Sequence, residues 1–439
     1  MILEEKSLFL PIVPNNKNLL NYFHKEVMQF CDKINAVPIR FVVTETNKKG
    51  YNCELGVLLQ AEGEEKLFFE IKKKIKKDII FQFRKREYQN SDNFNAVVLI
   101  PTGIGAQLGG HSGDGGAMIR LLASACDNLI THPNTVNAAD INEIPDNTLY
   151  VEGSVISRLL MGTMGLRKVR SNRVMVVIDE HDTLRFQDLA VNAVSAARVA
   201  LGLNCSEIIK NQDGFTMEAL FSESGRAIGK IEKLEKLMKI IEEKSGEYDA
   251  VAITSLIQVP KEFHMNYFVN ENIEVNPWGG VEAILTHTIS SLYNIPSAHS
   301  PMMESYEILN TDVGIVDPRK SAETVSMTYL HCILKGLHRS PKLVELDDKT
   351  EVNGLIRAED ISCLIIPEGC IGLPILAAIE QNIDVIIVKE NKNEMKNNLE
   401  EYPFRKDKIH IVENYWEAVG VMMALKTGVH PSSVRRPIK

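Results

Sequence analysis

A glycine-rich segment at residues 101–116, PTGIGAQLGGHSGDGG, carries the strongest chemical signal in the chain. Glycines allow positive φ angles and let backbone N–H groups approach a ligand, and the N-terminus of a following helix adds partial positive charge. This composition predicts a loop that binds a phosphate or a carboxylate, although glycines that only shape a turn are the alternative. The expected substrate-binding residues of the loop are Thr102, Gly103, Gly105, Gly109 and Gly110.

The spacing of these glycines differs from that of common nucleotide-binding loops. Gly103, Gly105 and Gly109 follow the pattern G-x-G-x-x-x-G, which is one residue longer than the dinucleotide fingerprint. The Gly-Lys-Ser/Thr sequence of a P-loop does not follow either. The pattern therefore disfavours an ATPase or a standard NAD enzyme.

His111 and Asp114 lie in the same loop, three residues apart. An imidazole with a neighbouring carboxylate is suited to general acid/base catalysis, in which His111 moves a proton and Asp114 orients it or binds a metal. The alternative for Asp114 is to cap the helix that begins near Gly115. We expect both residues to be catalytic.

Further polar residues follow two other apolar runs. In the loop at residues 132–142, His132, Asn134 and Asn137 are expected to bind substrate hydroxyl or carboxylate groups, or to form turns. Glu152 is a candidate general base, and Ser154 is either a substrate contact or, more in keeping with its type, the N-cap of the next helix.

The run ending at Ile178 leads into Asp179, His181 and Asp182, whose side chains are those of a divalent metal site. An acidic loop without metal is the alternative. His181 is also a second candidate for proton transfer.

Three residues near later apolar runs complete the predicted site. His299 either joins the pocket or is a hydrogen-bonded structural histidine. Arg319 either grips an anionic group through both guanidinium nitrogens or pairs with Glu323, four residues on. Glu368 is a further substrate-binding candidate, and its neighbour Cys370 is expected to be an unreactive thiol.

These loops must be positioned by alternating strands and helices. Short apolar runs recur at residues 97–100, 174–178, 250–253, 363–366 and 385–388, and several precede a polar loop and a segment of helical periodicity. The pattern predicts an α/β protein with largely parallel sheets, helices on both faces, Rossmann-like units and a smaller N-terminal α+β region. In such folds a ligand lies at the carboxyl ends of the strands.

We expect an N-terminal α+β region at 1–92, a central α/β domain with the glycine-rich loop at 93–345, and a C-terminal Rossmann-like region at 346–439. The N-terminal region carries a basic segment at 72–86, which we interpret as a solvated face rather than a nucleic-acid site.

Composition and net charge limit the kinds of partner that the protein is expected to bind. A net charge of -9 disfavours nucleic acid and anionic membranes, and no apolar window is long enough for a membrane span. The start of the chain does not resemble a signal peptide, and the seven cysteines are scattered. We therefore expect free thiols and a cytoplasmic location.

Several long stretches resemble one protein family. VVLIPTGIGAQLGGHSGD, LITHPNTVNAADIN, LYVEGSVISRLLMG, SNRVMVVIDEHD and IIPEGCIGLPILAAIEQ look like the bacterial family DUF3326, a domain of unknown function. The likeness covers most of the chain. It implies that these loops belong together, and it supplies no activity to transfer.

The leading hypothesis is an enzyme that acts by general acid/base chemistry on a small anionic metabolite, as a lyase, isomerase or transferase. The alternatives are a metal-dependent enzyme with a divalent cation near His181, and a non-catalytic metabolite sensor. The sequence is compatible with a homo-oligomer and does not determine the oligomeric state.

Overall fold

Six strands form a parallel sheet in the order β19-β18-β16-β4-β5-β6. The computed structural model describes residues 1–13, 18–74, 80–138, 141–205, 207–212, 214–269, 275–347, 349–399, 402 and 405–437. Every residue of β4, β5, β16 and β18 is buried, which explains their continuous apolar sequences. The strands are β4 (Asn95–Val98), β5 (Asn128–Thr131), β6 (Thr148–Tyr150), β16 (Ile361–Pro367), β18 (Asp384–Val388) and β19 (Ile409–Val412).

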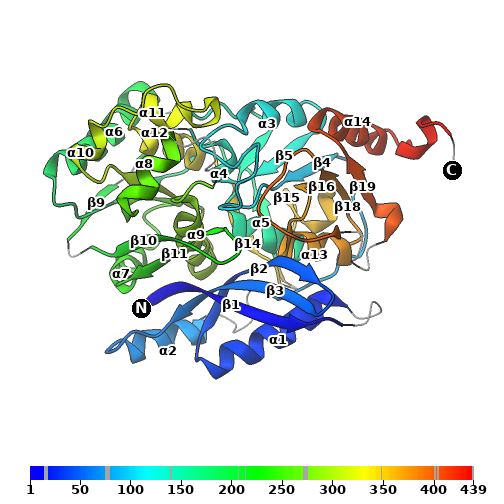
Figure 1. Ribbon diagram of the computed structural model, residues 1–439, viewed down its shortest axis with the longest axis horizontal. Helices are drawn as coiled ribbons and strands as arrows, with labels where there is room; N and C mark the ends of the chain where they lie inside the picture. The colour runs from blue at the N-terminus through cyan, green and yellow to red at the C-terminus, as the bar shows by residue number, and fades with distance from the viewer. Residues whose placement is uncertain are drawn as a thin grey trace.

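Helices cover both faces of this sheet (Figure 1). On one face α3 (Gly116–Ala123) packs against α14 (Tyr415–Lys426), and on the other α5 (Gly153–Leu160) packs against α13 (Leu373–Glu380). This part of the chain confirms the predicted parallel sheet between two helical layers.

The larger, ten-stranded sheet is mixed rather than largely parallel, in the order β17-β2-β3-β1-β11-β10-β12-β8-β9 with β13 beside β12. Its parallel part joins β8, β9, β12 and β13. The rest is mostly antiparallel, because residues 48–49 and 222–226 are connections too short for a crossover between parallel strands. The strands are β1 (Ile2–Pro11), β2 (Val37–Asn47), β3 (Gly50–Leu59), β8 (Val174–Asp179), β9 (Glu207–Asn211), β10 (Thr216–Phe221), β11 (Ala227–Glu232), β12 (Ala250–Gln258), β13 (Ser297–Met302) and β17 (Ile371–Gly372).

The remaining elements pack around the two sheets (Figure 1). A small sheet joins β7 (Met164–Arg167), β14 (Lys342–Glu345) and β15 (Leu355–Ile356). The other helices are α1 (Leu19–Lys33), α2 (Glu65–Lys74), α4 (Pro133–Val136), α6 (Leu184–Ala200), α7 (Glu235–Glu243), α8 (Lys261–Val269), α9 (Gly279–Tyr293), α10 (Tyr306–Leu309), α11 (Ser321–Val325) and α12 (Tyr329–His338). No helix of the described ranges is long and apolar enough to cross a membrane.

Both sheets combine strands from different predicted regions. β1 pairs with β11, so the N-terminal strands extend the sheet of the central strands. β16, β18 and β19 pair into the sheet that contains β4, β5 and β6. Of the basic segment, residues 75–79 lie outside the described part of the chain. All seven cysteines are buried free thiols, and burial raises the pKa of the Cys370 thiol, as expected for an unreactive group.

A buried ion network joins the N-terminal strands to the glycine-rich loop. Arg226, which is fully buried, donates from Nε to Oε2 of Glu54 at 2.6 Å and from a terminal nitrogen to Glu5. Arg40 lies 3.6 Å from Glu5 and donates to the carbonyl oxygen of Thr102 at 3.0 Å. Strands β1, β2 and β3 are thereby held to β11 and to the start of the loop.

We expect Arg226→Met to lower the free energy of unfolding by about 3–5 kcal/mol, because Glu5 and Glu54 would remain buried without their partner. Urea denaturation monitored by circular dichroism measures this. The matched control is Arg173→Met, which breaks an exposed ion pair with Asp249 and should lower the free energy of unfolding far less, because solvent screens exposed charges. Equal losses in the two variants would contradict the structural role of the network.

Candidate functional site

Two adjoining cavities lie where the carboxyl ends of the parallel strands meet helix α9. The first, which we call the dyad cavity, has a volume of about 100 Å³ and contains Glu152 and His287 in its wall. The second, the carboxylate cavity, has a volume of about 210 Å³ and is lined by Glu282, Glu304 and Glu323. The residues that line both are Thr102, Pro133, Asn134 and Thr286.

The dyad cavity is built from loops that follow four strands of the six-stranded sheet. It is lined by Thr102 after β4, His132 after β5, Glu152 after β6 and Cys370 after β16. Helix α9 and strand β2 close the other side. This is the sheet edge at which the strand pattern predicted a ligand.

Glu152 is the N-cap of α5, a role that the sequence suggested for Ser154. The Glu152 carboxylate accepts hydrogen bonds from the backbone N–H of Ser154 at 2.9 Å and from its hydroxyl. Thr286 also donates to Glu152, at 3.3 Å. Ser154 is therefore inside the helix, where its own N–H needs the cap.

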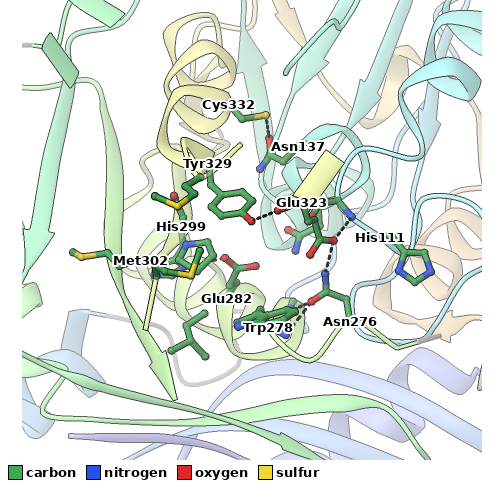
Figure 2. A pocket seen from close by; sticks show the side chains of 18 of the residues that line it. His111, Asn137, Asn276, Trp278, Glu282, His299, Met302, Glu323, Tyr329 and Cys332 are labelled. Carbon is green, nitrogen blue, oxygen red and sulfur yellow. Dashed lines mark hydrogen bonds and ion pairs between the residues drawn. The ribbon is translucent and has the colours of Figure 1, made fainter. Parts of the chain in front are cut away.

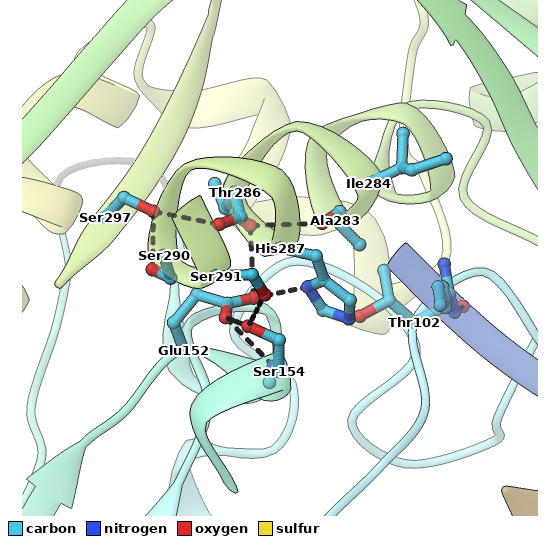
Figure 3. Close-up of polar contacts among 12 residues, drawn as sticks. Thr102, Glu152, Ser154, Ala283, Ile284, Thr286, His287, Ser290, Ser291 and Ser297 are labelled. Atoms are coloured by element: carbon cyan, nitrogen blue, oxygen red, sulfur yellow. Dashed lines mark hydrogen bonds and ion pairs between the residues drawn. The ribbon is translucent and has the colours of Figure 1, made fainter. Parts of the chain in front are cut away.

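The other oxygen of Glu152 pairs with Nδ1 of His287 (Figure 3). Burial acts to raise the pKa of Glu152, but His287 and the two hydrogen bonds from Ser154 together lower it. The carboxylate is therefore ionised, and the proton on this side of the imidazole must be carried by Nδ1. Nε2 of His287 is then the nitrogen available for proton transfer.

Two arginine side chains contribute to the lining of the dyad cavity. Arg40 and Arg158 line it, and burial lowers the pKa of each guanidinium to about 10, which leaves both protonated at neutral pH. Among the residues described, Glu152 is the one carboxylate in the lining.

In the carboxylate cavity, His299 orients Glu282 (Figure 2). Nδ1 of His299 lies 3.0 Å from Oε1 of Glu282, and Nε2 lies 2.9 Å from Oγ of Ser255. The order serine, histidine, carboxylate is that of a hydrolytic triad, but Ser255 is fully buried and also contacts Sδ of Met217. Ser255 is thus inaccessible as a nucleophile, and His299 positions the carboxylate.

A second relay in this cavity joins His111, Tyr267 and Glu323. The Tyr267 hydroxyl donates to Oε1 of Glu323 at 2.9 Å and lies 2.9 Å from Nδ1 of His111. Burial lowers the pKa of His111 to about 4 and raises that of Glu323. His111 is therefore neutral at pH 7, and it is poorly suited to act as a general acid there.

The amides of the glycine-rich loop already donate to carboxyl groups of the protein itself. Gly109 and His111 donate their backbone N–H groups to the two oxygens of Asp114, at 2.9 and 3.1 Å, and Ser112 donates to Glu323 at 3.2 Å. Burial raises the pKa of Asp114 to about 7. Asp114 thus stabilises the loop and does not face either cavity.

The structure brings most of the predicted site residues to the two cavities. Those in the dyad cavity are Thr102, His132, Asn134, Glu152 and Ser154. Those in the carboxylate cavity are Thr102, Gly103, Gly109, Gly110, His111, Asn134, Asn137 and His299. The lining of neither cavity includes Gly105, Asp114, Asp179, His181, Asp182, Arg319 or Glu368.

Arg319 pairs with Asp317 at 2.7 Å and with Gln107 at 3.0 Å, rather than with Glu323. Because a short 3₁₀ turn begins at Pro318, the carboxylate two residues earlier is nearer than the one four residues on.

Two of the three predicted metal ligands, His181 and Asp179, have other partners. Nε2 of His181 donates to the carbonyl oxygen of Met303 at 2.9 Å, and Nδ1 accepts from the N–H of Thr183 at 2.9 Å. Asp179 accepts from the side chain of Asn211 at 2.7 Å. Across the described ranges, no group of three or more His, Cys, Asp or Glu side chains is placed to hold a metal ion.

Sequence reasoning missed His287, Glu282 and Glu323. His287 and Glu282 lie on α9, whose segment reads as an ordinary buried helix, and Glu323 follows Arg319 on the next helical segment. Their only sequence signal is a charged or titratable residue in an otherwise apolar helix, which is too common to select them.

Burial lowers the pKa of His132 from 6.5 to about 4. The unfolded chain therefore binds this proton at a higher pH than the folded protein, so stability is lost as the pH falls from 6.5 towards 4. We expect His132 to contribute about 1.4 kcal/mol of this loss per pH unit.

His132→Gln should flatten the pH dependence of the unfolding free energy in this interval, as measured by urea denaturation at several pH values. The exposed His430 provides the control variant, His430→Gln, which should keep the wild-type slope. An unchanged slope in His132→Gln would show that His132 is not held neutral.

Comparison with known proteins finds one curated relative, named an uncharacterized lipoprotein, from Synechococcus sp. strain ATCC 27144/PCC 6301. It is 29% identical over 347 residues, which cover 78% of this chain and 93% of the relative. Its name contradicts the cytoplasmic location expected from the sequence, because a lipoprotein is anchored to a membrane. No solved structure matches the chain.

The family described as "Protein of unknown function (DUF3326)" matches residues 95–435. The match includes the loops after strands β4, β5, β6 and β16, which line the dyad cavity, and it confirms the resemblance seen in the sequence motifs. This chain belongs to the DUF3326 family.

Proposed function

We propose that this protein is an enzyme that binds a small metabolite in the dyad cavity and transfers a proton through His287. The observation that carries this proposal is the pair of the buried Glu152 and the half-buried His287 in the wall of a cavity. A carboxylate that fixes one imidazole nitrogen leaves the other as a directed general base.

The sheet supports this placement. Numbered by their order along the chain, the strands of the parallel sheet lie in the order 3-2-1-4-5-6, the arrangement of a Rossmann-like unit. The direction of the strand order reverses between β4 and β16, and the loops that follow these two strands both line the dyad cavity. Open α/β sheets bind their ligands in the crevice at such a reversal.

The charges favour an anionic group on the metabolite. Arg40 and Arg158 line the cavity, and each has a buried nitrogen without a hydrogen-bond partner among the described residues, although Arg40 also lies 3.6 Å from Glu5. A carboxylate or phosphate of the substrate would accept hydrogen bonds from these guanidinium groups.

The chemistry follows from the hydrogen bonds of the dyad. Nε2 of His287 takes a proton from a C–H or O–H group of the substrate, and the imidazolium that forms is stabilised by the ionised Glu152. The same nitrogen returns the proton to another atom of the substrate. Lyase, isomerase and transferase reactions all use such a step.

The proposal is tested by incubating the protein in D₂O with the small-molecule fraction of a bacterial extract and following metabolites by mass spectrometry. Wild-type protein should convert or deuterate an anionic metabolite. His287→Gln should do so about 10²–10⁴-fold more slowly, because the general base is lost.

His430→Gln serves as the matched control, since His430 is exposed and lines neither cavity, and it should keep wild-type activity. Full activity in His287→Gln would remove the dyad from the mechanism. Binding of a metabolite without conversion or deuterium uptake would contradict an enzyme and favour a sensor.

A further inference from the structure

The carboxylate cavity has an electrostatic character opposite to that of the dyad cavity. Glu282, Glu304 and Glu323 line it, whereas no lysine or arginine of the described ranges does. An anionic ligand would meet repulsion from these carboxylates without a compensating cation.

Three side chains in this wall, those of His111, His264 and Glu304, have polar atoms that nothing in the described structure satisfies. Nε2 of His111 is buried and has no hydrogen-bond partner among the described residues, although the residue is only 1% exposed. Oε2 of Glu304 is also buried without a partner among them, and burial raises the pKa of this carboxyl group. Buried polar atoms of this kind are costly unless a ligand or water satisfies them.

The unsatisfied atoms of His111 and Glu304 are hydrogen-bond acceptors. Because Tyr267 donates its hydroxyl proton to Glu323, its oxygen accepts from Nδ1–H of His111, and Nε2 of His111 is left with the lone pair. His299 turns one oxygen of Glu282 away and leaves the second on the cavity side (Figure 2). The cavity therefore offers acceptors to a ligand that brings its own donors.

The rest of the wall suits an organic group. Aromatic rings from Trp278, Phe268 and Tyr329 line the cavity together with Met302 and Met327. Ring faces attract an organic cation, and thioethers adapt to apolar groups of varied shape. A hydrated metal ion would gain little from such a surface.

We propose that the carboxylate cavity binds a small organic primary ammonium ion, with its N–H groups directed at the carboxylates and its apolar part against the rings. The site is separate from the His287 dyad, and its occupancy does not depend on the proposed reaction. The carboxylate cavity thus takes a cation, whereas the dyad cavity beside it takes an anion.

The test is isothermal titration calorimetry of the full-length protein with phenethylammonium, the neutral isostere 2-phenylethanol and the anion 3-phenylpropionate. Phenethylammonium should bind at least about tenfold more tightly than either, the range expected when hydrogen bonds to charged groups are lost. Equal binding of the alcohol, or preferential binding of the anion, would overturn the proposal.

Glu304→Gln is the most informative variant, because the Oε2 atom of Glu304 makes no hydrogen bond within the described residues that the change would break. It should weaken phenethylammonium binding about tenfold and leave 2-phenylethanol binding unchanged. Unchanged binding of the amine would place the ammonium elsewhere and refute the assignment.

Two further variants separate this proposal from the other. Glu243→Gln removes a carboxylate of the exposed Lys239–Glu243 pair and should leave amine binding unchanged. His287→Gln should also leave it unchanged, even where it abolishes turnover. Loss of amine binding in His287→Gln would mean that the two cavities are not independent sites.

Discussion

The buried ion network around Arg226 is the constraint on which the rest of the structure depends. A guanidinium group that is removed from water must keep its carboxylate partners, and Arg226 finds them on β1 and β3. Arg40, which lies beside Glu5 in the same network, donates to the carbonyl oxygen of Thr102. Ala227 adds a hydrogen bond from its N–H to the carbonyl oxygen of Gly103 at 2.8 Å. The start of the glycine-rich loop is thereby fixed at the point where both cavities share a wall.

Carboxylates with different partners divide the site into two parts. Asp114 is surrounded by loop amides and stabilises the backbone, whereas Glu152 is held by His287 and Ser154 and remains ionised. Glu323 lies against Tyr267 and Ser112 in a region without a lysine or arginine among the described lining residues. The same functional group thus organises a loop, orients the imidazole of His287 and contributes to an acceptor-rich cavity. The difference lies in what surrounds each one.

Much of the fold could be predicted from the sequence, because buried parallel strands are continuously apolar and their carboxyl ends carry polar loops. The runs at 97–100, 363–366 and 385–388 correspond to β4, β16 and β18, and the loops after them lie at one sheet edge. The mixed character of the large sheet was not visible, since apolar alternation does not specify strand direction. The joining of β1 to β11 was equally hidden, because it pairs residues more than two hundred positions apart along the chain.

The sequence by itself determined which loops gather at the sheet edge and supplied Glu152, His132 and His299 as members of the site. Only the tertiary structure decided their roles. Local sequence records the type of a side chain and its place in an element, but partners such as His287 come from helices distant in the chain. Asp114 shows the same limit. Its type and position in the sequence were compatible with a catalytic role, and only the fold shows that loop amides donate to its carboxyl group. Hydrogen bonding and burial, which set protonation and access, are properties of the assembled fold.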